Sequence, residues 1–117
     1  MVEVAVVSSD NTTASRLADL ISAHDFHVTI CTPDTLPTAL PELFVVAMPT
    51  LASPEEQVIE RLRADETTAN VPIVIVSGLP MNELQSVPYA SDWTIAIVPE
   101  PVEAPVLIDT INFLLGQ

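Results

Sequence analysis

Basic residues are nearly absent from this sequence. Its 117 residues include three Arg and no Lys against sixteen Asp and Glu, which gives a formal net charge of −13 at pH 7. A surface with this charge repels phosphate backbones and anionic lipids, so we expect no binding to nucleic acid or to membranes. Its partners should be neutral or basic. An acidic halophile-type surface is the alternative explanation, although such surfaces normally come with fewer apolar residues than the 49% found here.

Cysteine and long hydrophobic runs are also scarce. The single cysteine, Cys31, excludes an internal disulfide. Its place in a β-branched run predicts a buried structural thiol and not a reactive one. The apolar runs, such as 71–76 and 95–98, are far too short to span a membrane. No basic and apolar leader opens the sequence, so we expect a cytoplasmic protein.

What the sequence does contain is an alternation of apolar strand-like runs with amphipathic helical segments. Helices are expected after Asp10 or Asn11 as N-cap, after the Ser53 N-cap, and up to Gly116, with short ones at 34–40 and 81–87. Strands are expected at 2–7, 26–32, 43–48, 71–77 and 93–98. This order predicts one α/β domain, residues 1–117, with a parallel sheet covered by helices on both faces. Functional sites of such folds lie where the carboxyl ends of the strands meet.

Two segments carry a resemblance to a known family. Residues 58–65 and 70–78 are similar, almost position by position, to the third helix, loop and fourth strand of the receiver domain of two-component response regulators. The turn at 100–102 and the helix after it resemble that family's lysine-proline-aromatic turn and last helix. The resemblance covers essentially the whole chain. It implies a doubly wound, flavodoxin-like fold with five parallel strands in the order 2-1-3-4-5.

The residues that this family uses for phosphorylation are missing from the corresponding positions. Counting back without a gap from the third helix puts Ala47 at the phosphoacceptor aspartate, and alanine has no nucleophile. Ser8 and Ser9 replace the acidic pair that holds magnesium, and two neutral hydroxyls make a poor magnesium site. Glu100 replaces the lysine, and only Ser77 keeps the family's residue type. The resemblance therefore implies a degenerate receiver, or pseudo-receiver, without a metal ion or a cofactor.

Other polar residues near these positions have two interpretations each. Glu100 could accept hydrogen bonds from the pocket serines and lock the pocket, but a solvated loop position is the favoured interpretation. Asp10 is expected to cap the first helix and not to replace a metal ligand. His24 and His27 lie three residues apart with no further His or Cys nearby, so a surface role is expected over metal binding.

The resemblance also implies a partner-binding face, formed in receivers by the fourth helix, fifth strand and fifth helix. Trp93, together with Tyr89, could anchor a partner on this face, or it could simply cover the core, and both interpretations stay open. A homodimer through this face is one form that the interaction could take. The face would comprise Met81, Leu84, Gln85, Tyr89, Trp93, Ile95, Ile97 and Asp109.

Three hypotheses of different class follow. The leading one is a signalling receiver domain that works by phosphorylation-independent protein–protein interaction. The second is a small-molecule sensor whose emptied pocket at Ser8, Ser9, Ala47 and Ser77 binds an uncharged or cationic metabolite, because no glycine-rich phosphate cradle is present. An enzyme ranks last, because no nucleophile and base converge on the strand ends.

Overall fold

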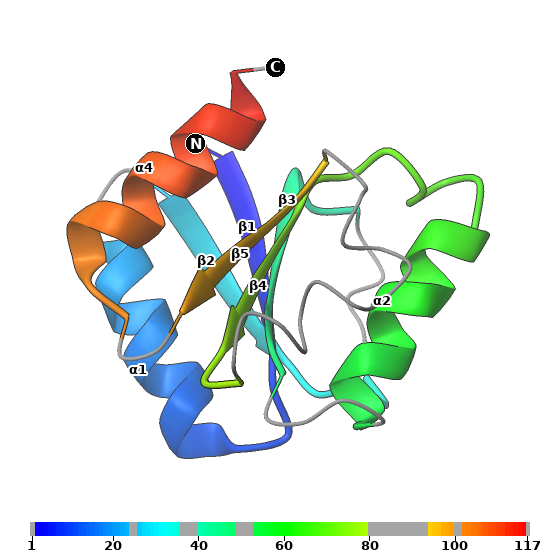
Figure 1. The fold of residues 1–117 in the computed structure, drawn as a ribbon, viewed down its shortest axis with the longest axis horizontal. Coiled ribbons are helices and arrows are strands. Elements are labelled where there is room, and N and C mark those ends of the chain that lie inside the picture. The colour runs from blue at the N-terminus through cyan, green and yellow to red at the C-terminus, as the bar shows by residue number, and fades with distance from the viewer. Residues whose placement is uncertain are drawn as a thin grey trace.

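The chain forms a five-stranded parallel sheet in the order β2-β1-β3-β4-β5 (Figure 1). The computed structural model describes residues 2–23, 26–35, 40–48, 53–79, 94–99 and 102–116. The predicted fold class and strand order are confirmed, and five strand boundaries differ from expectation by one or two residues. One cause is Pro72, which has no N–H to donate to a sheet ladder, so that the fourth strand begins after it. The strands are β1 (Val2–Val7), β2 (Phe26–Cys31), β3 (Leu43–Ala47), β4 (Ile73–Ser77) and β5 (Ile95–Pro99).

Helices cover both faces of this sheet. Helices α1 (Asn11–Ser22) and α4 (Ala104–Leu115) lie on one face, and α2 (Pro54–Ala64) lies on the other (Figure 1). The predicted caps are confirmed at Asp10 for α1 and at Ser53 for α2, where the serine side chain accepts a hydrogen bond from the backbone N–H three residues on. No helix in the described ranges is long and apolar enough to cross a membrane.

The two short helices expected at 34–40 and 81–87 fall largely or wholly outside the described residues. Of the first, Asp34 lies in a turn, which is closed by a hydrogen bond of 3.1 Å from the Thr35 N–H to the Thr32 carbonyl.

Side chains alternate along each strand between two apolar layers, as the two-residue period of a strand requires. The layer under α1 and α4 includes Val4, Val6, Val45 and Val74. The layer under α2 includes Ala5, Val7, Phe44, Val46, Ile73 and Ile75. Because both of its faces are buried, the central strand β3 is apolar throughout and shows no polar alternation.

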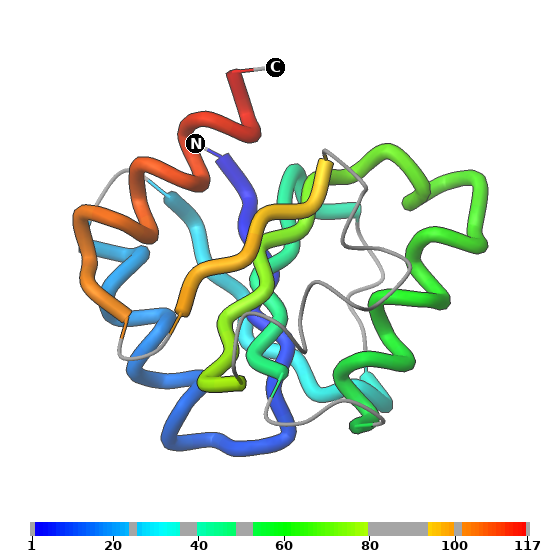
Figure 2. The backbone as a smooth tube through the Cα atoms, viewed as in Figure 1, coloured from blue at the N-terminus to red at the C-terminus, as the bar shows by residue number. Residues whose placement is uncertain are grey.

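All five strands run in the same direction, so their carboxyl ends meet at one edge of the sheet. Figure 2 follows the chain through each strand from the upper edge of the view to the lower one. The lower edge therefore gathers the residues that follow β1, β3 and β4, which are far apart in the sequence.

Candidate functional site

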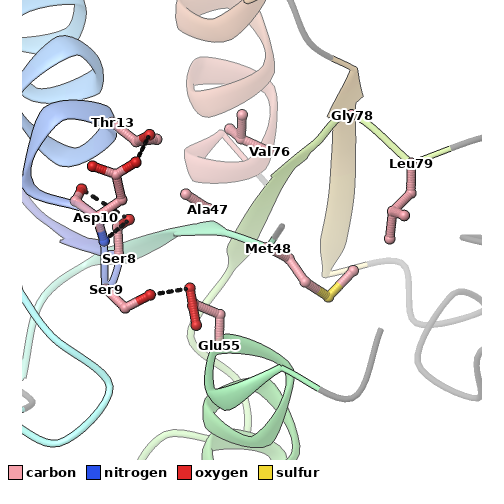
Figure 3. Close-up of a pocket in the computed structure, with 10 residues that line it drawn as sticks. All are labelled: Ser8, Ser9, Asp10, Thr13, Ala47, Met48, Glu55, Val76, Gly78 and Leu79. Atoms are coloured by element: carbon pink, nitrogen blue, oxygen red, sulfur yellow. Dashed lines mark hydrogen bonds between the residues drawn. The ribbon is translucent and has the colours of Figure 1, made fainter. Parts of the chain in front are cut away.

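A cavity of about 360 Å³ lies at this carboxyl edge (Figure 3). Its volume falls within the range of small-ligand sites, which begins at roughly 300 Å³. The structure brings together Ser8, Ser9 and Ala47 here, as the sequence predicts. The described residues that line the cavity are Ser8, Ser9, Asp10, Thr13, Ala47, Met48, Glu55, Val76, Gly78 and Leu79.

The loop between β1 and α1 forms one wall of the cavity and is held by its own hydrogen bonds. The hydroxyl of Ser8 accepts from the backbone N–H of Asp10 at 3.0 Å and donates to the Asp10 carbonyl at 3.2 Å. The Asp10 carboxylate accepts from the Thr12 N–H at 2.9 Å and from the Thr13 hydroxyl at 3.2 Å. Asp10 therefore caps α1 through the Thr12 N–H, as expected from the sequence, and its second carboxylate oxygen is held by Thr13.

The opposite wall holds a carboxylate that the sequence analysis did not assign to the site. Glu55 stands in the first turn of α2 and is only 1% exposed. Its Oε2 accepts a hydrogen bond of 2.9 Å from the Ser9 hydroxyl, and Figure 3 shows the side chain rising from the helix toward Ser9. Its Oε1 is buried and has no hydrogen-bond partner within the part of the chain that the structure describes. The N-terminal end of α2 carries a partial positive charge that favours a carboxylate at this place.

A signal for Glu55 was present in the sequence. The residues three, four and seven positions further on are Val58, Ile59 and Leu62, and all three are buried. Glu55 therefore shares the core-facing stripe of α2, whereas the neighbouring Glu56 is only half-buried. An acidic residue on the apolar stripe, in the first turn of a helix that starts at the carboxyl edge, indicates a site residue and not a solvated charge.

The other two residues predicted for the pocket are Ser77 and Glu100. Ser77 is buried at the end of β4, where its hydroxyl oxygen accepts a hydrogen bond of 3.2 Å from the Leu79 N–H. It is not among the residues that line the cavity. Glu100 lies outside the described residues, so its pairing with the serines stays a prediction.

Part of the expected partner face can be located. Ile95 and Ile97 are half-buried in the edge strand β5 and pack against the apolar layer under α2. Asp109 is exposed on α4. Met81, Leu84, Gln85, Tyr89 and Trp93 lie outside the described residues.

Two other residues considered in the sequence have clear positions. His27 is exposed, and its Nδ1 lies 2.7 Å from Oε2 of Glu3, its register partner on β1. His24 lies outside the described residues. Cys31 is buried as expected, and this burial raises the pKa of its thiol above the ordinary value.

Strand order, parallel pairing and helices on both faces define a doubly wound, flavodoxin-like α/β domain. Solved structures narrow this to the receiver fold. The receiver domain of a signal transduction histidine kinase from Syntrophus aciditrophicus is 15% identical, with a TM-score of 0.82, over 99% of this chain and 91% of that one. A putative response regulator from Chloroflexus aurantiacus is 14% identical, with a TM-score of 0.83, over 98% of both chains.

A third match is also a receiver domain. The receiver domain of a sensor histidine kinase from Pseudomonas aeruginosa is 11% identical, with a TM-score of 0.81, over 98% of both chains, and its structure has a magnesium ion coordinated in the active-site cleft. No protein-family model and no curated protein matches the sequence. At these identities the likeness establishes that the chain has the fold of response regulator receiver domains.

Proposed function

We propose that this chain is a receiver-like signalling domain that acts by binding other proteins and does not depend on phosphorylation. The observation that carries the proposal is Ala47. It ends the central strand β3 and lines the cavity, at the position that the resemblance assigns to the phosphoacceptor. A methyl group there cannot attack a phosphoryl donor, so no acyl phosphate can form at this position.

The described cavity residues also suit magnesium poorly. Magnesium prefers one or two carboxylates and several waters in near-octahedral order. Ser8 and Ser9 are neutral, Asp10 uses one oxygen to cap α1 and the other to accept from Thr13, and Oε2 of Glu55 accepts from Ser9. Among the residues that the structure describes, no three His, Cys, Asp or Glu side chains gather where they could share a metal ion. We therefore assign no magnesium-dependent step to this domain.

The hydrogen bond between Ser9 and Glu55 supports a conformation that needs no modification. It joins residues 46 positions apart, and so ties the loop after β1 to the first turn of α2. A contact of this kind between a hydroxyl and a buried carboxylate holds the two walls of the cavity in one arrangement. From the sequence, Glu100 is the candidate for such a lock, with a solvated loop position favoured for it; we propose that Glu55 forms the lock.

The proposed partner is a neutral or basic protein, or a second copy of the chain, bound at the face that includes Ile95 and Ile97. The net charge of −13 disfavours nucleic acid and anionic membranes as partners. A cytoplasmic location belongs to the same proposal and is supported by the single cysteine, which has no partner for a disulfide within the chain.

Intact mass spectrometry tests the phosphorylation part. The protein is incubated with acetyl phosphate and MgCl₂, beside a receiver domain that has its acceptor aspartate. We expect the control to gain a phosphoryl group and this chain to keep its mass. A phosphoryl adduct on this chain, mapped by peptide analysis to Asp10 or Glu55, would contradict the proposal.

Sedimentation equilibrium tests the interaction part. Trp93→Ala and Tyr89→Ala should weaken self-association, or binding to a partner captured with the wild-type chain, while circular dichroism stays unchanged. Ile30→Ala is the matched control, because Ile30 is 46% exposed on the opposite edge strand β2. Equal weakening by Ile30→Ala, or no change with either aromatic variant, would place the interface elsewhere.

A further inference from the structure

The buried carboxylate of Glu55 has a hydrogen-bonding capacity that the protein leaves unused. Oε2 accepts from Ser9, whereas Oε1 is shielded from water and has no hydrogen-bond partner among the described residues. A buried acceptor without a donor destabilises the fold, and more so when it is charged. Polar atoms in protein interiors are normally paired, so an orphaned oxygen in a cavity wall needs an explanation. A ligand that donates a hydrogen bond is one.

We propose that the cavity binds a small organic ligand with a primary ammonium group, for which Glu55 is the counter-ion. The cavity is acidic, because Asp10 and Glu55 line it and no basic side chain does so among the described residues. Rotation about the terminal torsion of a glutamate is soft and roughly two-fold, so either oxygen of Glu55 can turn toward a ligand.

The pairing pattern favours ammonium over other cations. A guanidinium group frequently binds a carboxylate through two parallel hydrogen bonds, one to each oxygen, and the Ser9 hydroxyl already occupies one acceptor site of Oε2 and restricts that geometry. An ammonium group is a compact charge whose donors can serve one oxygen. The hydroxyls of Ser9 and Thr13 lie in the wall opposite Glu55 and offer further acceptors.

The rest of the cavity suits an apolar ligand body. Its other walls come from Ala47, Met48, Val76 and Leu79, whose side chains are apolar. The volume of about 360 Å³ far exceeds the space that one metal ion needs, since a water molecule takes about 30 Å³ in the liquid. A short alkylammonium places its charge at Glu55 and its chain against these residues.

The test is a nuclear magnetic resonance titration of ¹⁵N-labelled protein with n-butylammonium chloride at constant ionic strength. We expect saturable shifts at the backbone amides of Ser9, Met48 and Glu55. Four further probes serve as controls. n-Butanol lacks the charge and butyrate reverses it. Tetramethylammonium lacks N–H donors, and MgCl₂ replaces the organic cation with a metal ion. None of them should reproduce the shifts.

Glu55→Gln keeps the shape of the side chain and removes its charge, so it should weaken n-butylammonium binding by at least about tenfold, equivalent to ~1.4 kcal/mol. Glu60→Gln removes the same charge from an exposed position of α2 and should leave binding unchanged. Ala47→Val narrows the cavity while keeping Glu55, and it should also weaken binding.

The inference is overturned if n-butylammonium does not bind, if Glu55→Gln binds it as well as the wild type, or if n-butanol or tetramethylammonium binds equally. Magnesium shifts at the same amides that disappear in Glu55→Gln would assign the site to a metal ion instead. The inference does not rest on the proposed function. Amine binding reports on Glu55, whereas the phosphorylation experiment reports on Ala47, so the two can fail separately.

Discussion

The hydroxyl of Ser9 donates a hydrogen bond of 2.9 Å to the carboxylate of Glu55 across the cavity. Among the described residues, no other group donates a hydrogen bond to this carboxylate. Helix α2 thus presents to the cavity a buried acidic group that is half satisfied. The contact links the two walls of the site, and its energetics can be measured directly.

Ser9→Ala should lower the free energy of unfolding by about 1–3 kcal/mol, because both oxygens of a buried carboxylate then lack a donor. The measurement is urea unfolding followed by circular dichroism. In a Glu55→Met background the same substitution should change stability by less than about 0.5 kcal/mol, since the acceptor is gone. An equal cost in both backgrounds would mean that the hydroxyl stabilises the fold through something other than Glu55.

Glu55→Met by itself should raise the free energy of unfolding by about 1–3 kcal/mol, because it replaces a half-satisfied buried carboxylate with an apolar side chain of similar length. The same variant should lose n-butylammonium binding. Glu60→Met, on the exposed face of α2, should stay within about 0.5 kcal/mol of the wild type. A loss of stability in Glu55→Met would show that the carboxylate is retained for the fold and not for a ligand.

Arg63→Lys should lower the free energy of unfolding by about 1.5–3 kcal/mol, the usual contribution of hydrogen bonds to charged groups. The guanidinium donates to the Thr68 carbonyl at 3.3 Å, the Val71 carbonyl at 3.0 Å and the Thr94 hydroxyl at 2.8 Å, and so joins α2 to the start of β5. A lysine ammonium cannot reproduce this planar fork.

Arg61→Lys is the comparison for that variant, because Arg61 is exposed and donates to the Pro33 carbonyl at 2.8 Å. It should cost less than Arg63→Lys in thermal and urea unfolding. Equal effects of the two substitutions would count against the bridging role of Arg63.

The buried thiol of Cys31 should make stability depend on pH in the alkaline range. Burial raises the pKa of this thiol in the folded state above its ordinary value of 9.0. The raised pKa stabilises the fold fully below the unfolded pKa, and this contribution is lost as the pH rises through the folded pKa. The urea midpoint of the wild type should therefore fall from pH 8 upward more steeply than that of Cys31→Ala.

Labelling with a thiol reagent gives a second measure of the same group. The native protein should react slowly and the unfolded chain rapidly, because the nucleophile is the thiolate and the folded state suppresses it. Parallel pH profiles for wild type and Cys31→Ala, together with fast native labelling, would show that the thiol is open to solvent.

The sequence by itself determined most of the helices and strands, the parallel sheet and the residue types at the carboxyl ends of the strands. An uninterrupted apolar run such as 43–48 must be covered on both of its faces, which is typical of a strand in a parallel sheet. Asp10 and Ser53 mark helix starts because their side chains satisfy backbone N–H groups that no carbonyl can reach. The residue type alone shows that Ala47, at the end of β3, carries no nucleophilic group.

Only the tertiary structure decided how the cavity is built. The partner of Ser9 lies 46 residues away, and the local sequence around either residue does not predict that the two come into contact. Their meeting depends on the order of β1 and β3 in the sheet and on the rotation of α2, which turns Glu55 inward with Val58 and Ile59. Residue periodicity sets the type of an element and places Glu55 on the apolar stripe of α2. A site between elements is set by how they pack, so the pairing of Glu55 with Ser9 is visible only in the folded chain.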